Sequence, residues 1–235
     1  MPSVVTYVDA FNLYRGLKRY AAHEKARGWK WLDLDQISRR LVPGADVAAI
    51  HYFTAHLVTI EGGDESQRGR QSVYLRALRT FDHTTVHLGQ YKARKQRYPL
   101  RFTPDDEGVE MLRAAGQQPR RVSTGHVTVD VWKMEEKGSD VNLATQLLAD
   151  AFYREVEHAV VISNDTDLCS PIQLVRSRLG IPVTVVCPEG HKSTAYDLRK
   201  AATQVRKLRM NVVQASQLPT LLFDATGKIE KPQTW

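Results

Sequence analysis

Short β-branched segments that lead directly into helical segments constrain the fold of this chain more than any other feature. Residues 159–162 read Ala-Val-Val-Ile, and residues 183–186 read Val-Thr-Val-Val. A helical pattern over residues 167–179 and a Gly-Ile-Pro turn at residues 180–182 connect them. Strands of a parallel sheet are buried on both faces and have this composition, and crossover helices join them. We therefore predict an α/β fold with a parallel sheet.

The same alternation of strand and helix recurs along the chain. Residues 4–8 form a β-branched run, which a polar turn and a helical pattern follow. The remaining candidates are strands at 47–53, 85–88 and 126–132, and helices at 67–81 and 139–152. This order predicts a Rossmann-like sheet sandwiched by helices.

Two segments do not fit the alternation. Residues 91–125 are long, polar and rich in Arg, Pro and Gly, so we expect an inserted basic loop. Residues 211–235 contain turn signals at 218–219 and 224–227. We expect this tail to be a short appendage, a C-terminal extension packed on the main domain of residues 1–210.

Composition indicates the class of protein and the charge of its partners. The 235 residues contain 33 Lys and Arg against 26 Asp and Glu, a net charge of +7 that favours an anionic partner such as nucleic acid. No apolar run approaches the ~18 residues that span a bilayer, so we expect no membrane insertion. Both cysteines, Cys169 and Cys187, lie in apolar surroundings and the N-terminus lacks a signal-peptide pattern. We expect a cytoplasmic protein with reduced thiols.

Acidic residues fall at the ends of predicted strands and at a helix start. Asp9 ends the first strand, Asp165 and Asp167 follow the strand at 159–162, and Asp140 lies in the first turn of a helix. The carboxyl ends of parallel strands share one edge of a sheet, so Asp9 and Asp165 would meet if their strands are neighbours. Asp140 could join them.

Such a cluster would require a cation or a retained proton. Two unit charges about 4 Å apart repel by on the order of 4 kcal/mol at an effective dielectric of 20. Oxygen ligands without His or Cys select Mg²⁺ or Mn²⁺. A plainer alternative stays open, because Asp9 could simply cap a turn and Asp140 could simply complement the helix dipole. Asn12 could support a turn or hold Asp9. Glu135 and Glu136 are most simply solvated, although one of them could add a ligand.

Basic residues cluster near the start of the insertion. Three aromatic residues and no acid accompany the cluster, which comprises Lys92, Arg94, Lys95, Arg97 and Arg101. A single-stranded nucleic-acid surface uses this mixture, with cations for phosphates and rings for bases. A solvated face has a similar composition, so both interpretations stay open.

Three segments resemble the signature blocks of NYN domains, the PIN-like nuclease group. They are Val4-Val5-Thr6-Tyr7-Val8-Asp9-Ala10-Phe11-Asn12-Leu13, Glu136-Lys137-Gly138-Ser139-Asp140-Val141-Asn142-Leu143-Ala144, and Val161-Ile162-Ser163-Asn164-Asp165-Thr166-Asp167-Leu168. The likeness covers about residues 4–209, and residues 231–235 also resemble the tail of bacterial members. One departure is Asn164, which stands where many relatives carry Gly.

The resemblance implies a PIN-like parallel sheet and a Mg²⁺ or Mn²⁺ site formed by Asp9, Asp140 and Asp165. It places Asp167 nearby and gives Asn12 a supporting role. The implied activity is metal-dependent phosphodiester hydrolysis, usually of RNA, and single-stranded RNA is the expected partner. The resemblance is also compatible with a homo-oligomer.

Two alternatives to the nuclease remain. The first is a non-catalytic module that binds RNA or a nucleotide, which the basic cluster supports. The second is an oxidoreductase, because bacterial proteins of this family type include NADH-dependent hydroxylases named for small aromatics such as hydroxylated pyridines. The chain has no G-x-G-x-x-G motif, so the residues themselves give an NADH site little support.

Overall fold

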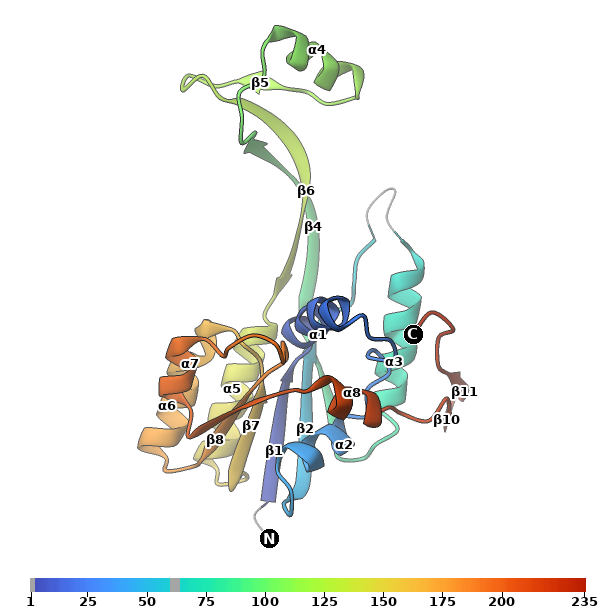
Figure 1. Cartoon of the computed structure of the whole chain (residues 1–235), viewed down its shortest axis with the longest axis vertical. Coiled ribbons are helices and arrows are strands. Elements are labelled where there is room, and N and C mark those ends of the chain that lie inside the picture. The colour runs from blue at the N-terminus through green and yellow to red at the C-terminus, as the bar shows by residue number, and fades with distance from the viewer. Residues whose placement is uncertain (1–2, 60–63) are drawn as a thin grey trace.

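A six-stranded parallel sheet forms the centre of the molecule, in a computed structural model that describes residues 3–59 and 64–235. Every pairing within it is parallel, in the order β3-β2-β1-β7-β8-β9 (Figure 1). The strands are β1 (Ser3–Asp9), β2 (Asp46–Thr54), β3 (Thr84–Leu88), β7 (His158–Ile162), β8 (Val183–Cys187) and β9 (Gln204–Lys207). The predicted α/β sheet is confirmed, and the polar edge strand β9 is an addition to it. The strand predicted near 126–132 is wrong as a member of this sheet, because it belongs to β6 (Val127–Lys137), which pairs antiparallel outside it.

The strand order reverses direction between β1 and β7, at the middle of the sheet. From β1 the chain proceeds outward to β2 and β3, whereas β7 leads outward to β8 and β9 on the other side. Tyr7 pairs with Val161 and Val8 with Ile162, so the carboxyl ends of the two central strands lie side by side. In open α/β sheets, ligands bind at this switch point.

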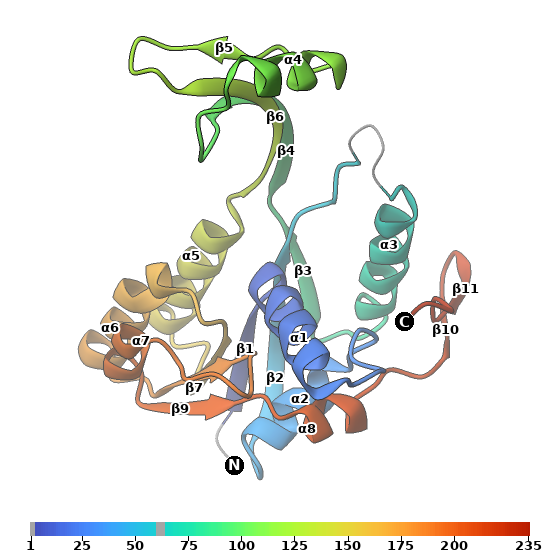
Figure 2. The same cartoon turned by 45° about the horizontal axis from the view of Figure 1, so that its top comes forward.

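Helices cover both faces of the sheet (Figures 1 and 2). One layer contains α1 (Ala10–Glu24), α2 (Leu34–Leu41), α3 (Ser66–Leu78) and α8 (Met210–Ala215). The other contains α5 (Ser139–Phe152), the short 3₁₀ helix η1 (Thr166–Leu168), α6 (Cys169–Arg178) and α7 (Tyr196–Ala201).

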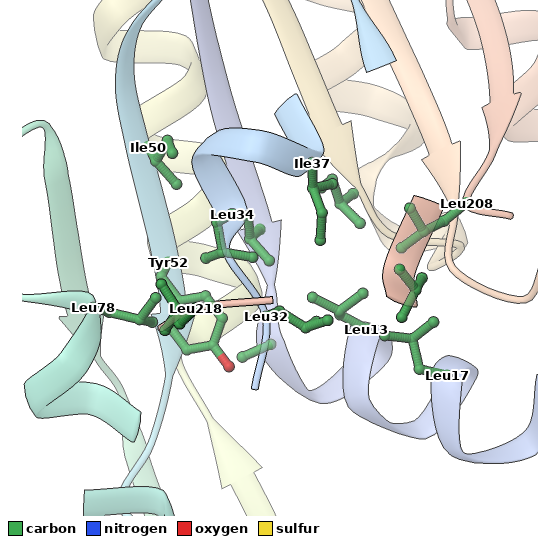
Figure 3. Close-up of a cluster of buried hydrophobic side chains, with 14 of the residues drawn as sticks. Leu13, Leu17, Leu32, Leu34, Ile37, Ile50, Tyr52, Leu78, Leu208 and Leu218 are labelled. Carbon is green, nitrogen blue, oxygen red and sulfur yellow. The ribbon is translucent and has the colours of Figure 1, made fainter. Parts of the chain in front are cut away.

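Side chains of β1 alternate between two hydrophobic cores. Val4 and Val8 pack in the core under α1 and α2, and Val5 and Tyr7 pack in the core under α5 and α6. Figure 3 shows part of the first core, to which α1 contributes Leu13 and Leu17, α2 contributes Leu34 and Ile37, and β2 contributes Ile50 and Tyr52. Burial on both faces fixes the register of β1, because a shift by one residue would exchange the two sets.

The predicted insertion at 91–125 is not a loop, which corrects the expectation from its composition. Strand β4 (Gln90–Pro99) pairs antiparallel with β6 (Val127–Lys137), and β5 (Arg120–Arg121) adds a third strand. Helix α4 (Asp106–Ala114) lies between β4 and β5. We call this unit the arm, residues 90–137; it projects away from the sheet and its helices (Figures 1 and 2).

The C-terminal segment folds back onto the first core. Strands β10 (Leu221–Asp224) and β11 (Gly227–Glu230) form an antiparallel hairpin in which Ile229 is buried. The indole nitrogen of Trp31 donates a hydrogen bond to the carbonyl of Pro219 at 2.8 Å. These contacts place Trp235 beside Trp31, with ring centroids 6.2 Å apart.

A buried hydrogen bond ties α5 to the central strand. The hydroxyl of Tyr7 donates to Asp150 Oδ2 at 2.7 Å, and Gln146 donates to Asp150 Oδ1 at 2.6 Å. Burial and the neighbouring Asp150 carboxylate raise the pKa of Tyr7 well above its usual value, so this hydroxyl keeps its proton. The bond fixes α5, which carries Asp140, against the strand that ends at Asp9.

Tyr7→Phe tests the strength of this tie. The variant leaves a buried carboxylate without one donor, so we expect a loss of about 1–3 kcal/mol in the free energy of unfolding. Urea denaturation measures it, with Tyr14→Phe as the control, since Tyr14 is 47% exposed. Equal stability of the two variants would show that the hydrogen bond contributes nothing.

Candidate metal centre

Three aspartates converge at the switch point. Asp9 ends β1, Asp165 follows β7, and Asp140 lies in the first turn of α5. One carboxylate oxygen from each lies within 4.8 Å of the other two. The structure thus brings together the three residues for which the sequence predicts a metal site.

Hydrogen bonds hold the Asp9 carboxylate in place. Its Oδ1 caps α1 by accepting from the backbone N–H of Asn12 at 2.9 Å, and its Oδ2 accepts from the Ser163 hydroxyl at 2.9 Å. The residue is 4% exposed. Burial raises the pKa of Asp9, although these two hydrogen bonds oppose the shift. The side chain that caps α1 therefore also belongs to the group of three carboxylates.

The loop after β7 is held by side chains on both sides. The amide oxygen of Asn12 accepts from the backbone N–H of Asn164 at 3.0 Å. The side-chain oxygen of Asn164 in turn accepts from the N–H of Ala195 at 2.9 Å. Asn164 thus links the loop to the start of α7. The backbone N–H of Asp165 donates to the Ser163 hydroxyl at 3.1 Å, which connects Asp165 to Asp9 through one serine.

Burial and repulsion among the carboxylates raise the pKa of Asp140. The pKa of Asp140 is raised to about 6, first by burial and then by the charges of Asp9 and Asp165. Glu136 contributes a smaller part of the same shift. A group of negative charges that resists ionisation is what a divalent cation would relieve. The donor set is oxygen alone, so the residues fit Mg²⁺ or Mn²⁺.

Two other acids differ in their relation to this centre. Asp167 is exposed, and the three-residue group does not include it; its backbone N–H donates to Asp165 Oδ1 at 3.0 Å. Glu136 is half-buried, and its Oε1 accepts from the N–H of Ser139 at 2.9 Å, at the start of α5. Its charge contributes to the raised pKa values of Asp9 and Asp140. Ser163 is the supporting residue that the sequence argument missed. Its place directly after a strand, at the same edge as Asp9, was the available signal.

Comparison with known proteins identifies the family. The model of the NYN domain matches residues 3–209. The chain belongs to the NYN domain family. This nuclease-like family agrees with the resemblance of the three sequence blocks, each of which supplies one aspartate to the centre.

Two individual proteins are similar to this NYN chain. The 6-hydroxy-3-succinoylpyridine 3-monooxygenase of Pseudomonas putida is 28% identical over 250 aligned positions, which cover 97% of this chain and 74% of that enzyme. A solved protein of unknown function from Vibrio parahaemolyticus aligns with a TM-score of 0.47 at 14% identity, covering 88% of this chain and 93% of its own.

The predicted nucleic-acid-binding residues lie on or just beyond β4 of the arm. Lys92 and Arg94 lie on one face of the two-stranded ribbon, and Lys95 and Arg97 lie on the other, because side chains alternate along a strand. Arg101 follows β4 and is exposed. The five cations therefore surround the ribbon and do not form a single patch.

Residues of β6 partly neutralise the cations of β4. Arg97 makes two hydrogen bonds to Asp130, at 3.0 and 2.7 Å, and Arg94 pairs with Glu135 at 3.2 Å. Lys95 lies 5.3 Å from the centre of the Trp132 ring, which is 42% exposed. The arm therefore presents a cation and an aromatic surface together on one face.

Proposed function

We propose that this protein hydrolyses phosphodiester bonds of single-stranded RNA with Mg²⁺ or Mn²⁺ held by Asp9, Asp140 and Asp165. The observation that carries the proposal is the convergence of three carboxylates, two of them with raised pKa values, at the switch point of an NYN fold.

We place the activity in the cytoplasm, where the free thiols of Cys169 and Cys187 would stay reduced. Among the described residues, no helix is long and apolar enough to cross a membrane.

The chain's own residues would prepare the site for this chemistry. A bound divalent ion would polarise the phosphate and activate water. Ser163 and the N–H of Asn12 fix both oxygens of Asp9, so this ligand requires little reordering. Asn12 and Asn164 hold the loop that presents Asp165. Burial and the neighbouring carboxylates raise the pKa of Asp140 to about 6, so this carboxyl would take up a proton at mildly acidic pH when no ion is present.

We include the arm in the proposed RNA-binding surface. Lys92 and Lys95 are exposed on its opposite faces, and Lys95 lies beside the Trp132 ring. We expect the double variant Lys92→Gln, Lys95→Gln to bind single-stranded RNA about tenfold more weakly. The slope of the logarithm of the binding constant against the logarithm of the salt concentration should become less steep by up to about 2. Filter binding across a salt series measures both. Lys228→Gln, Lys231→Gln is the control with the same charge loss; equal affinity of the two double variants would remove the arm from the surface.

The direct test of the proposal is cleavage of an end-labelled single-stranded RNA by the purified chain. We expect product with Mn²⁺ and none after EDTA treatment, with recovery when Mn²⁺ is restored. Product that persists in EDTA would contradict metal dependence. Salt-sensitive binding without product would favour the non-catalytic module instead.

A second candidate is an NADH-dependent hydroxylase of a small aromatic compound. The similarity to the P. putida monooxygenase, which extends over 97% of this chain, is the observation that favours it. NADH oxidation in the presence of a hydroxylated pyridine, followed at 340 nm, distinguishes the two candidates. Turnover that depends on the pyridine, with no RNA cleavage, would support the hydroxylase.

A further inference from the structure

A cavity of about 520 Å³ opens along α1, whose first residues, directly after Asp9, form part of its lining. Its walls come from α1, α3, the segment that precedes α2, and the C-terminal residue, and Figure 2 shows α1 facing α3. Seven aromatic residues line it: Phe11, Tyr14, Trp29, Tyr52, Tyr74, Tyr91 and Trp235. The volume lies within the about 300–1,000 Å³ typical of small-molecule sites.

Positive charge accompanies these rings. Arg15, Lys18, Lys30 and Arg70 line the cavity, and no Asp or Glu side chain of the described residues does. Arg70 pairs at 2.7 Å with Asp64, which does not line the cavity. The cavity thus gathers cations and lacks the acids that would balance them.

Lys30 lies beside two of the aromatic rings of the cavity. Its Nζ lies 5.4 Å from the ring centre of Trp29 and 6.0 Å from that of Trp235. The pKa of Lys30 is lowered, first by burial and then by the charges of Arg70 and Lys18. Cations that disfavour one another are stabilised together when an anion binds between them.

The walls are held in place by the protein itself. Gln71 donates to the carbonyl of Ala55 at 2.9 Å and accepts from the N–H of Leu57 at 2.9 Å, which fixes the strand-end side of the cavity. Tyr14 packs against Trp29 with ring centroids 5.4 Å apart, and the rings of Tyr74 and Trp235 meet at 5.8 Å. A cavity built this way is preformed, so a ligand would not have to order it.

We propose that this cavity binds a small planar aromatic ring that carries a negatively charged group. The rings would stack on the ligand, and Lys30 with its neighbouring cations would pair with the charge. A nucleoside monophosphate and an aromatic carboxylate both have this chemistry. The proposal goes beyond the nuclease activity, because it needs no metal and no cleavage.

Calorimetric titration of the full chain in EDTA tests the cavity independently of the metal centre. The charged probes are uridine 5′-monophosphate, guanosine 5′-monophosphate and pyridine-3-carboxylate; the uncharged probes are uridine, guanosine and pyridine-3-carboxamide, and inorganic phosphate tests the anion alone. We expect at least one charged ring to bind saturably below about 1 mM, and at least tenfold more tightly than its uncharged partner and than phosphate. The probe that binds most tightly identifies the source of the ring.

Lys30→Met assigns the binding to this cavity. We expect this variant to bind the charged probe at least tenfold more weakly than the wild-type protein does. Its affinity for the uncharged probe should change little. Lys200→Met is the matched control, because Lys200 also lies over a ring, 4.5 Å from the centre of Tyr196, outside the cavity. The proposal is overturned if no probe binds at about 5 mM, if charged and uncharged rings bind equally, or if Lys30→Met and Lys200→Met behave alike. RNA cleavage that persists under any of these outcomes would leave the nuclease proposal intact.

Discussion

Asp165→Asn is expected to lower the rate of Mn²⁺-dependent RNA cleavage by about 100-fold or more, since a metal ion contributes several kcal/mol and about 1.4 kcal/mol is a factor of ten. The variant removes a ligand charge and keeps the fold. Asn is a good helix cap, and its side-chain oxygen can still accept from the N–H of Asp167. Initial rates on a labelled RNA measure the loss.

Two further variants make this result specific. Asp46→Asn removes the same charge at the opposite end of the sheet, where Asp46 pairs with Ser3 and is exposed, so we expect no change. Asp167→Asn removes a charge from the same loop but outside the three-residue group, and we expect a smaller loss than for Asp165→Asn. Cleavage by Asp165→Asn at the rate of Asp46→Asn would remove Asp165 from the site.

Asp140→Asn is expected to abolish cleavage and at the same time to stabilise the metal-free protein. Since the folded pKa is about 6 against an ordinary aspartate value of 3.8, the folded state binds the proton more tightly than the unfolded chain. The stability contributed by this group therefore falls as the pH rises from about 4 through about 6. Because the residue is partly exposed and helps the helix dipole, we expect a gain of about 1–2 kcal/mol at pH 7.5.

Urea denaturation in EDTA at pH 7.5 and pH 4.5 measures this effect. The gain should be largest at pH 7.5 and small at pH 4.5, where Asp140 is protonated in the folded protein. Mn²⁺ should raise the midpoint of the wild-type protein and leave that of Asp140→Asn nearly unchanged. A destabilised Asp140→Asn at pH 7.5 would show that the carboxylates do not repel one another.

The sheet and the centre could be predicted because their signals are local. Asp9 and Asp165 each follow a buried β-branched strand, and strand ends of a parallel sheet share one edge. To predict that Asp140 belongs to the same group, one further inference was needed, namely that α5 begins at that edge of the sheet. Ser163 supplies a hydrogen bond rather than a charge, so an argument built on carboxylates passed over it.

Other features depend on contacts between distant segments. Strand β4 pairs with β6 across the helix and turns between them, and no two-residue hairpin signal marks such a pairing. Alternation is weak in β4 because both faces of the arm are polar, and the composition then resembles a loop. The cavity joins Trp29 to the last residue, Trp235, and no local pattern connects the two.

The central claim, that three aspartates form a divalent metal centre, is tested most directly by Mn²⁺ titration of the metal-free protein in a calorimeter. This measurement does not depend on the substrate. We predict saturable binding to the wild-type protein and to Asp46→Asn, and its loss in Asp9→Asn and in Asp165→Asn, with all four proteins folded by circular dichroism. Equal binding by all four would contradict the account, because Mn²⁺ would then bind elsewhere on the chain.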